Sequence, residues 1–251
     1  MSNWRTEARA LRAAMMFFTR LPIPSAASWE PSDLQRAAAY FPLVGWLVGG
    51  VAALVWWLGA RIWPPVVASG VSLAATLLLT GAFHEDGWAD VCDGFGGGTS
   101  CERVLEIMRD SRVGAFGVIG VVVMLGLKWQ SVAALSGAWV PAVLIAGHAV
   151  SRAAAVSLMA TLPYVRKESV KAKPMATALR GGRLVFALVC GLAAILWLPE
   201  RTWWAVVAVI AARGALAWWF KRRIGGYTGD CLGAAQQVCE VVFYLTILAL
   251  A

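Results

Sequence analysis

Long apolar runs recur along the whole chain, and they constrain its fold more than any other feature. They lie near residues 40–60, 64–83, 113–135, 138–160, 183–199, 203–220 and 233–250. Each has the length, roughly 17–25 residues, at which a helix crosses the hydrocarbon core of a bilayer. Tryptophan and proline mark several of their ends, as at Trp63-Pro64-Pro65, which is typical of an aromatic belt at a membrane surface. The sequence therefore predicts an integral membrane protein with about seven transmembrane helices.

These runs favour helices over strands, because Ala, Leu and Gly are abundant and period-2 alternation is rare. Only 14% of the residues are charged, against about a quarter in soluble domains. We expect an all-α, polytopic bundle in which residues 1–251 form one domain. The last two runs are the least regular, since Arg213 lies within one and Glu240 within the other.

The basic residues indicate the orientation of the chain. The net charge is +8. With the N-terminus inside, most Lys and Arg fall in cytoplasmic segments, whereas Arg61, Lys128 and Arg201 fall on the outer side, as the positive-inside rule requires. These charges are divided among loops, so they do not indicate nucleic-acid binding. The 5 cysteines show neither CxxC pairing nor zinc-ligand spacing, which predicts reduced, structural thiols.

The first 24 residues predict an N-terminal amphipathic segment. Trp4, Ala8, Leu11, Met15 and Phe18 recur at helical spacing, with arginines off this stripe. Such a helix can lie in the lipid headgroup plane or pack on the bundle. The sequence leaves both arrangements open.

Residues 84–112 form an acidic segment in this otherwise hydrophobic chain. We expect this segment to form a cytoplasmic loop after the second run. Its first part reads HEDGWADVCDGFGGG. Asp86, Asp90 and Asp93 would lie on one face of a helix, where their charges repel. A divalent cation would convert this repulsion into binding. Because every ligand is an oxygen, Mg²⁺, Mn²⁺ or Ca²⁺ is expected rather than zinc.

Other polar groups are expected on the same side. Arg109 and Arg112 suit phosphate oxygens, and Asp110 could complete a metal shell. Asp230 lies in a glycine-rich turn that opens a helix, and the basic loop at 163–183 contributes Lys173 and Arg180. This combination predicts a metal–pyrophosphate site. His148, Arg152 and Arg213, placed within the apolar runs, either line a polar cavity or stabilise helix contacts.

Five stretches together resemble one family over essentially the whole chain. They are FFTRLPIP (17–24), FHEDGWADVCDGFGGG (83–98), MRDSRVGAFGV (108–118), SRAAA (151–155) and GYTGDCLGAAQQ (226–237). In this order they resemble the cobalamin synthases, also called adenosylcobinamide-GDP ribazoletransferases. The one departure is Trp88, where the family pattern leads us to expect Leu.

The resemblance implies a Mg²⁺-dependent enzyme of the bacterial inner membrane, with its active site facing the cytoplasm. It would join adenosylcobinamide-GDP to α-ribazole or α-ribazole-5'-phosphate, releasing GMP, a step of nucleotide loop assembly in cobalamin biosynthesis. Whether the chain forms a homo-oligomer stays open. The expected site residues are, for the metal, Glu85, Asp86, Asp90 and Asp93; for catalysis, Asp86, Asp90, Asp93, Asp110 and His84; and for substrate phosphate, Arg109, Arg112, Lys173, Arg180 and Asp230.

Two other classes compete with this interpretation. A CDP-alcohol phosphatidyltransferase would carry DGxxAR, but here Asp90 follows Ala89 and no Arg comes next. A transporter would place its ionisable groups near the bilayer midplane, whereas most of them here cluster at one end of the predicted helices.

Overall fold

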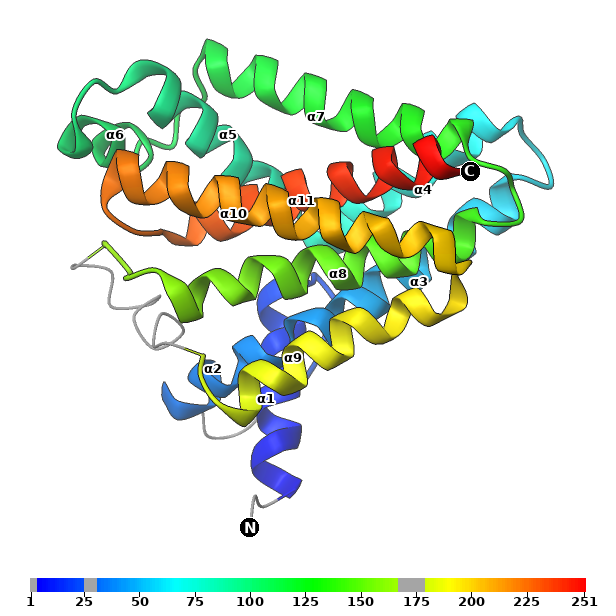
Figure 1. The fold of residues 1–251 in the computed structure, drawn as a ribbon, viewed down its shortest axis with the longest axis horizontal. Helices are drawn as coiled ribbons and strands as arrows, with labels where there is room; N and C mark the ends of the chain where they lie inside the picture. The colour runs from blue at the N-terminus through cyan, green and yellow to red at the C-terminus, as the bar shows by residue number, and fades with distance from the viewer. Residues whose placement is uncertain (1–3, 25–30, 167–178) are drawn as a thin grey trace.

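The computed structural model describes residues 4–24, 31–166 and 179–251, and most of them are helical (Figure 1). The predicted all-α bundle is confirmed. The helices are α1 (Trp4–Phe18), α2 (Pro31–Ala37), η1 (Ala38–Tyr40), α3 (Phe41–Gly59), α4 (Pro65–Thr80), α5 (Phe83–Gly97), α6 (Cys101–Ile107), α7 (Ala115–Ala134), α8 (Val140–Thr161), α9 (Gly182–Ala193), η2 (Ala194–Trp197), η3 (Glu200–Trp203), α10 (Trp204–Ile224) and α11 (Gly229–Leu250).

The number of membrane-crossing helices differs from the predicted seven. Among the described residues, 5 helices are long and apolar enough to cross a membrane, or up to 6 if α4 and α5 together make one broken span. The apolar helix at 182–197 is shorter. A count of seven spans is therefore not confirmed, although each predicted run does form helix.

Helix α8 lies at the centre of the bundle and packs against α3, α9 and α11. Close approach of α3 depends on two glycines. A Cβ at Gly45 would lie 2.4 Å from the carbonyl oxygen of His148, and one at Gly49 would lie 2.6 Å from the Cα of Ile145. Small residues at such crossings let helix backbones pack closely, which stabilises helix pairs inside a membrane.

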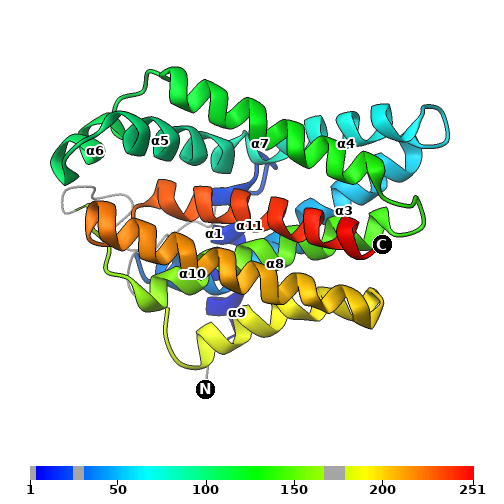
Figure 2. The same ribbon diagram turned by 45° about the horizontal axis from the view of Figure 1, so that its top comes forward.

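The chain bends sharply between α4 and α5, by 89°. Gly81 and Ala82 make the bend, with φ values of 66° and 54°. Glycine adopts such left-handed backbone readily, whereas alanine does so at a cost. Figure 2 shows α7 running beside both α4 and α5, and α11 packs against α5 and α7. The bend thus turns α5 away from the direction of α4 and carries its acidic residues with it.

Helix α1 crosses the long helices at a steep angle (Figure 1). Its buried residues are Ala10, Ala13, Ala14 and Phe18, whereas Trp4 is exposed. The packed face is thus displaced from the predicted stripe and lies against the rest of the protein. Glu7 connects this helix to the rest of the protein, because it accepts hydrogen bonds from Tyr40 (2.7 Å) and Arg183 (2.8 Å). Contact of α1 with a lipid surface remains a prediction.

We expect Gly49→Ala to destabilise the protein and the adjacent Gly50→Ala to have little effect. The new methyl group at residue 49 would collide with the α8 backbone, whereas a Cβ at Gly50 meets nothing within 4 Å. Overpacking of this kind costs about 1–3 kcal/mol. Thermal unfolding of both variants in the same detergent measures the difference, and equal melting temperatures would contradict the described packing of α3 on α8.

Candidate active site

The acidic segment is helical rather than a loop. Residues 84–97 belong to α5, and α6 follows after a short connection. The segment expected to form a cytoplasmic loop over 84–112 thus contains two helices, and its cytoplasmic position remains a prediction. Its glycines serve packing: a Cβ at Gly94 would lie 2.4 Å from Cγ of Met108, and one at Gly98 would lie 2.5 Å from Cγ2 of Val104. They let α6 fold back tightly on the end of α5.

Asp86 and Asp90 lie one turn apart on α5, and the structure brings them to Asp230 of α11. Asp90 interacts electrostatically with both of the other carboxylates. The helices touch here, since a Cβ at Gly87 would lie 3.0 Å from the Cα of Asp230. Three of the predicted acids from two distant parts of the sequence thus form one cluster.

Arg166 adds a positive charge to this cluster, and sequence reasoning did not single it out. Its Nη2 donates to Asp230 at 2.6 Å and to the carbonyl oxygen of Met108 at 2.9 Å. Its Nε is buried and has no hydrogen-bond partner among the described residues. A guanidinium beside three carboxylates provides a donor for phosphate oxygens.

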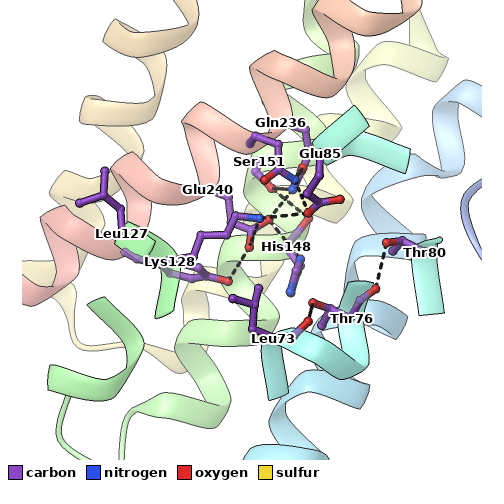
Figure 3. A network of polar contacts seen from close by, with 12 residues as sticks. Leu73, Thr76, Thr80, Glu85, Leu127, Lys128, His148, Ser151, Gln236 and Glu240 are labelled. Carbon is purple, nitrogen blue, oxygen red and sulfur yellow. Dashed lines mark hydrogen bonds and ion pairs between the residues drawn. The ribbon is translucent and has the colours of Figure 1, made fainter. Parts of the chain in front are cut away.

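Glu85 points away from this cluster, into the interior of the bundle (Figure 3). It accepts a hydrogen bond from Gln237 at 2.8 Å and lies 3.6 Å from Nζ of Lys128. Successive residues of a helix are about 100° apart, so Glu85 and Asp86 cannot share a face. The structure therefore separates Glu85 from the carboxylates with which the sequence grouped it.

Glu240 is the centre of the buried network that Glu85 joins (Figure 3). It lies 3.2 Å from Nζ of Lys128 and 3.3 Å from Nδ1 of His148, and Tyr244 donates to it at 3.1 Å. Gln236 donates to both Glu240 and Ser151. Arg152 extends the network, with Nη1 3.0 Å from the carbonyl oxygen of His148. Charges inside a membrane bundle are costly unless they are compensated, and here four helices supply the partners.

The position of Lys128 differs from the predicted distribution of charges. We expected it on the outer side of the membrane, but it is buried within α7 and paired with acids. A lysine and a glutamate in apolar runs indicate a buried pair, because each needs a partner. That signal was present in the sequence. Arg213, by contrast, bonds Ser157 and Thr161 of α8, which fits the predicted role in helix contacts.

Asp93, although on the same helix as Asp86 and Asp90, holds the start of α7. Its carboxylate accepts hydrogen bonds from the backbone amides of Gly114 (2.7 Å) and Gly117 (2.8 Å). A carboxylate at a helix N-terminus satisfies amides that have no partner within the helix. Asp93 also borders a hollow between α5, α6 and α7.

Asp110 and Arg112 line that same hollow and form an ion pair of 2.6 Å. Hydrogen bonds from Arg112 lower the pKa of Asp110 to about 2, so this carboxylate stays charged at neutral pH. Asp86, Asp90 and Asp230 do not line this hollow, whereas Asp93 lines it and also interacts electrostatically with Asp90.

The remaining predicted site residues have different surroundings. His84 is buried and stacks on Phe18, with ring centroids 5.5 Å apart. Arg109 and Arg180 are exposed. Lys173 lies outside the described residues.

The carboxylates offer oxygen ligands but no assembled metal cage. Among the described residues, no three His, Cys, Asp or Glu side chains are grouped so as to hold a metal ion. Mg²⁺ is commonly bound through one or two carboxylates together with substrate phosphates. Asp86 and Asp90 fit that mode of binding.

Fold and site together define a polytopic membrane protein with an acidic and basic cluster at one end of its helices, a class suited to handling phosphorylated substrates. The model of the cobalamin-5-phosphate synthase (CobS) family matches residues 10–248, and the chain belongs to this family. Adenosylcobinamide-GDP ribazoletransferase of Ralstonia pickettii is 50% identical over 99% of this chain and 98% of its own length. The enzyme of that name from Shewanella amazonensis is 44% identical, over 100% and 98%. No solved structure matches the chain.

The buried network predicts a strong dependence between its members. Lys128→Met would leave Glu240 and Glu85 without their ammonium partner, and we expect a loss of about 3–5 kcal/mol in the free energy of unfolding. In Lys128→Met/Glu240→Gln, part of this stability should return, because one unpaired charge is also removed. Thermal unfolding in detergent of both single variants and the double variant tests this, and additive losses would contradict the pairing.

Proposed function

We propose that this chain transfers the phospho-cobinamide part of adenosylcobinamide-GDP to α-ribazole or α-ribazole-5'-phosphate and releases GMP. The observation that carries the proposal is the 50% identity to a ribazoletransferase over 99% of the chain. These matches favour neither the CDP-alcohol phosphatidyltransferase nor the transporter.

The chemistry requires a ribose hydroxyl of the acceptor to attack the phosphorus attached to cobinamide while the bond to GMP breaks. Negative charge grows on the leaving GMP. We assign the stabilisation of this charge to Arg166 and to a divalent cation that Asp86 and Asp90 would hold. Arg166 would donate its unpartnered Nε to a phosphate oxygen. Arg109, Arg112, Arg180 and Lys173 would attract the charged substrates.

Mg²⁺ is the cofactor we propose, with Asp86 and Asp90 as its protein ligands. When bound, it would neutralise phosphate charge and favour departure of GMP. Glu85 and Asp93 are less suited to this role, because Glu85 belongs to the buried network and Asp93 holds α7. Asp230, or His84 on the neighbouring helix α5, would accept the proton of the ribose hydroxyl.

We also propose that the chain lies in the bacterial inner membrane with this cluster on the cytoplasmic side. Lys221, Arg222 and Arg223 close α10 at the end where Asp230 begins α11. Arg166 follows α8 at that end. Cytoplasmic segments are enriched in Lys and Arg, so the charge of this end supports the orientation.

The reaction should depend on a divalent cation. Membranes that contain the protein, adenosylcobinamide-GDP and α-ribazole-5'-phosphate should release GMP and form the joined corrinoid with Mg²⁺, stop in excess EDTA, and recover when Mg²⁺ is restored. Mass spectrometry of both products measures this. The absence of joined product with Mg²⁺ would refute the proposed reaction, and full activity in EDTA would refute the metal alone.

Removal of either cluster acid should abolish most turnover. We expect Asp86→Asn and Asp90→Asn each to lower kcat by at least about a hundredfold. The metal ion would lose a protein ligand, and the phosphate charge would be neutralised less well in the transition state. Glu102→Gln, an exposed acid of α6 outside the cluster, is the control and should stay near the unaltered rate. Membrane insertion is checked by immunoblot. Unchanged turnover in both aspartate variants would contradict the site.

A further inference from the structure

An apolar cavity lies next to the acidic cluster, and Arg152 and Gln236 of the buried network form part of its wall. It contains about 680 Å³ free of protein atoms, part of it open to solvent, and lies where α1, α3, α5, α8 and α11 meet. Its wall includes the rings of Phe18, Phe41, Phe83 and Tyr227. Concave sites with apolar, aromatic walls and a few polar groups are typical of sites for small organic ligands.

A buried cationic donor lies in this mostly apolar wall. Arg152 lines the cavity and is 3% exposed. Its Nη1 is used by His148, but its Nε is buried without a hydrogen-bond partner among the described residues. An unsatisfied buried N–H costs free energy, which a ligand with a suitable acceptor would recover. This donor is the observation that indicates a ligand rather than simple packing.

The cavity also adjoins the proposed reaction centre. Gly229, which precedes Asp230, forms part of its wall, as do His84 and Gly233. A Cβ at Gly233 would lie 3.1 Å from the carbonyl oxygen of His84 and 3.5 Å from the Cα of Gly87. A ligand held there would have its outer end beside Asp86 and Asp230.

We infer that this cavity binds the benzimidazole ring of the acceptor nucleoside, with Arg152 donating a hydrogen bond to the ring nitrogen that carries no sugar. The inference rests on the proposed function and names the place of one of its substrates. A flat, neutral, largely apolar ring matches aromatic walls that carry the Arg152 donor. Its ribose would then project toward the carboxylates, where the hydroxyl must react.

The other parts of the substrates fit this cavity less well. A guanine ring presents several donors and acceptors, and most would stay unpaired against these walls. The corrin macrocycle, with its many amide arms, needs a wider and more polar site. A lipid acyl chain would match the walls but would leave the Arg152 donor unpaired.

The first test fills the cavity. Ala155 lines it and Ala160 does not, although both lie on α8. For Ala155→Phe we expect KM for α-ribazole to rise about tenfold or more, while KM for adenosylcobinamide-GDP stays within about twofold, and for Ala160→Phe we expect neither to change. Unchanged KM values in an active Ala155→Phe variant, or a rise only for adenosylcobinamide-GDP, would overturn the inference and leave the proposed function standing.

The second test uses the unaltered protein, so it does not depend on the folding of a variant. Free 5,6-dimethylbenzimidazole should inhibit competitively against α-ribazole but not against adenosylcobinamide-GDP. 5,6-Dimethylindane, which lacks the ring nitrogens, should inhibit about tenfold more weakly. Equal inhibition by the two would point to a lipid-like apolar site and overturn the hydrogen bond to Arg152.

A photoreactive azidobenzimidazole locates the ring directly. Labelling should fall on α8 near Val156 and Met159 or on the segment around Tyr227, and excess α-ribazole should suppress it. Labelling confined to other peptides would overturn the location. If no joined product forms in the unaltered membranes with Mg²⁺, the proposed function itself fails, which is a separate result.

Discussion

The buried carboxylate of Glu240 is the group on which the arrangement of the inner helices depends. It lies between Lys128 of α7 and His148 of α8, and through Gln236 and Gln237 of its own helix it connects to Glu85 of α5. An ion in this environment is tolerated only where partners surround it. The requirement fixes the rotation and depth of four helices at once, because apolar contacts alone would allow each to slide or turn.

This constraint at the interior determines what the surface of α5 presents. Since Glu85 is held inward, the residue after it must face another direction, and Asp86 and Asp90 are directed to Asp230. The bend at Gly81 and Ala82 gives α5 its own direction relative to α4. A structural carboxylate and proposed catalytic carboxylates therefore lie side by side in the sequence but in separate environments in the fold.

Sequence reasoning succeeded where a property is local and failed where it depends on helix rotation. The apolar runs predicted the helical segments, and the spacing of Asp86 and Asp90 predicted their common face. Spacing could not show that Glu85 turns inward or that Asp93 binds the amides of α7, because both depend on which neighbour each helix face meets. The assignment of basic residues to the two sides of the membrane placed Lys128 outside, although it lies within the apolar run at 113–135. Arg166 lacked any motif of its own, and only folding brings it to Asp230.

Arg152 connects the interior to the proposed chemistry, and this explains why the network extends so close to the active site. One edge of its guanidinium bonds the carbonyl oxygen of His148, and electrostatic attraction to Glu240 and Glu85 offsets the cost of burying it. The positive charge is thus held in place before any substrate arrives. A donor fixed in advance loses little entropy on binding, so its hydrogen bond can select a ring nitrogen against an apolar competitor. The same buried ions that hold α5 against α11 would thereby also hold the acceptor beside Asp86 and Asp230.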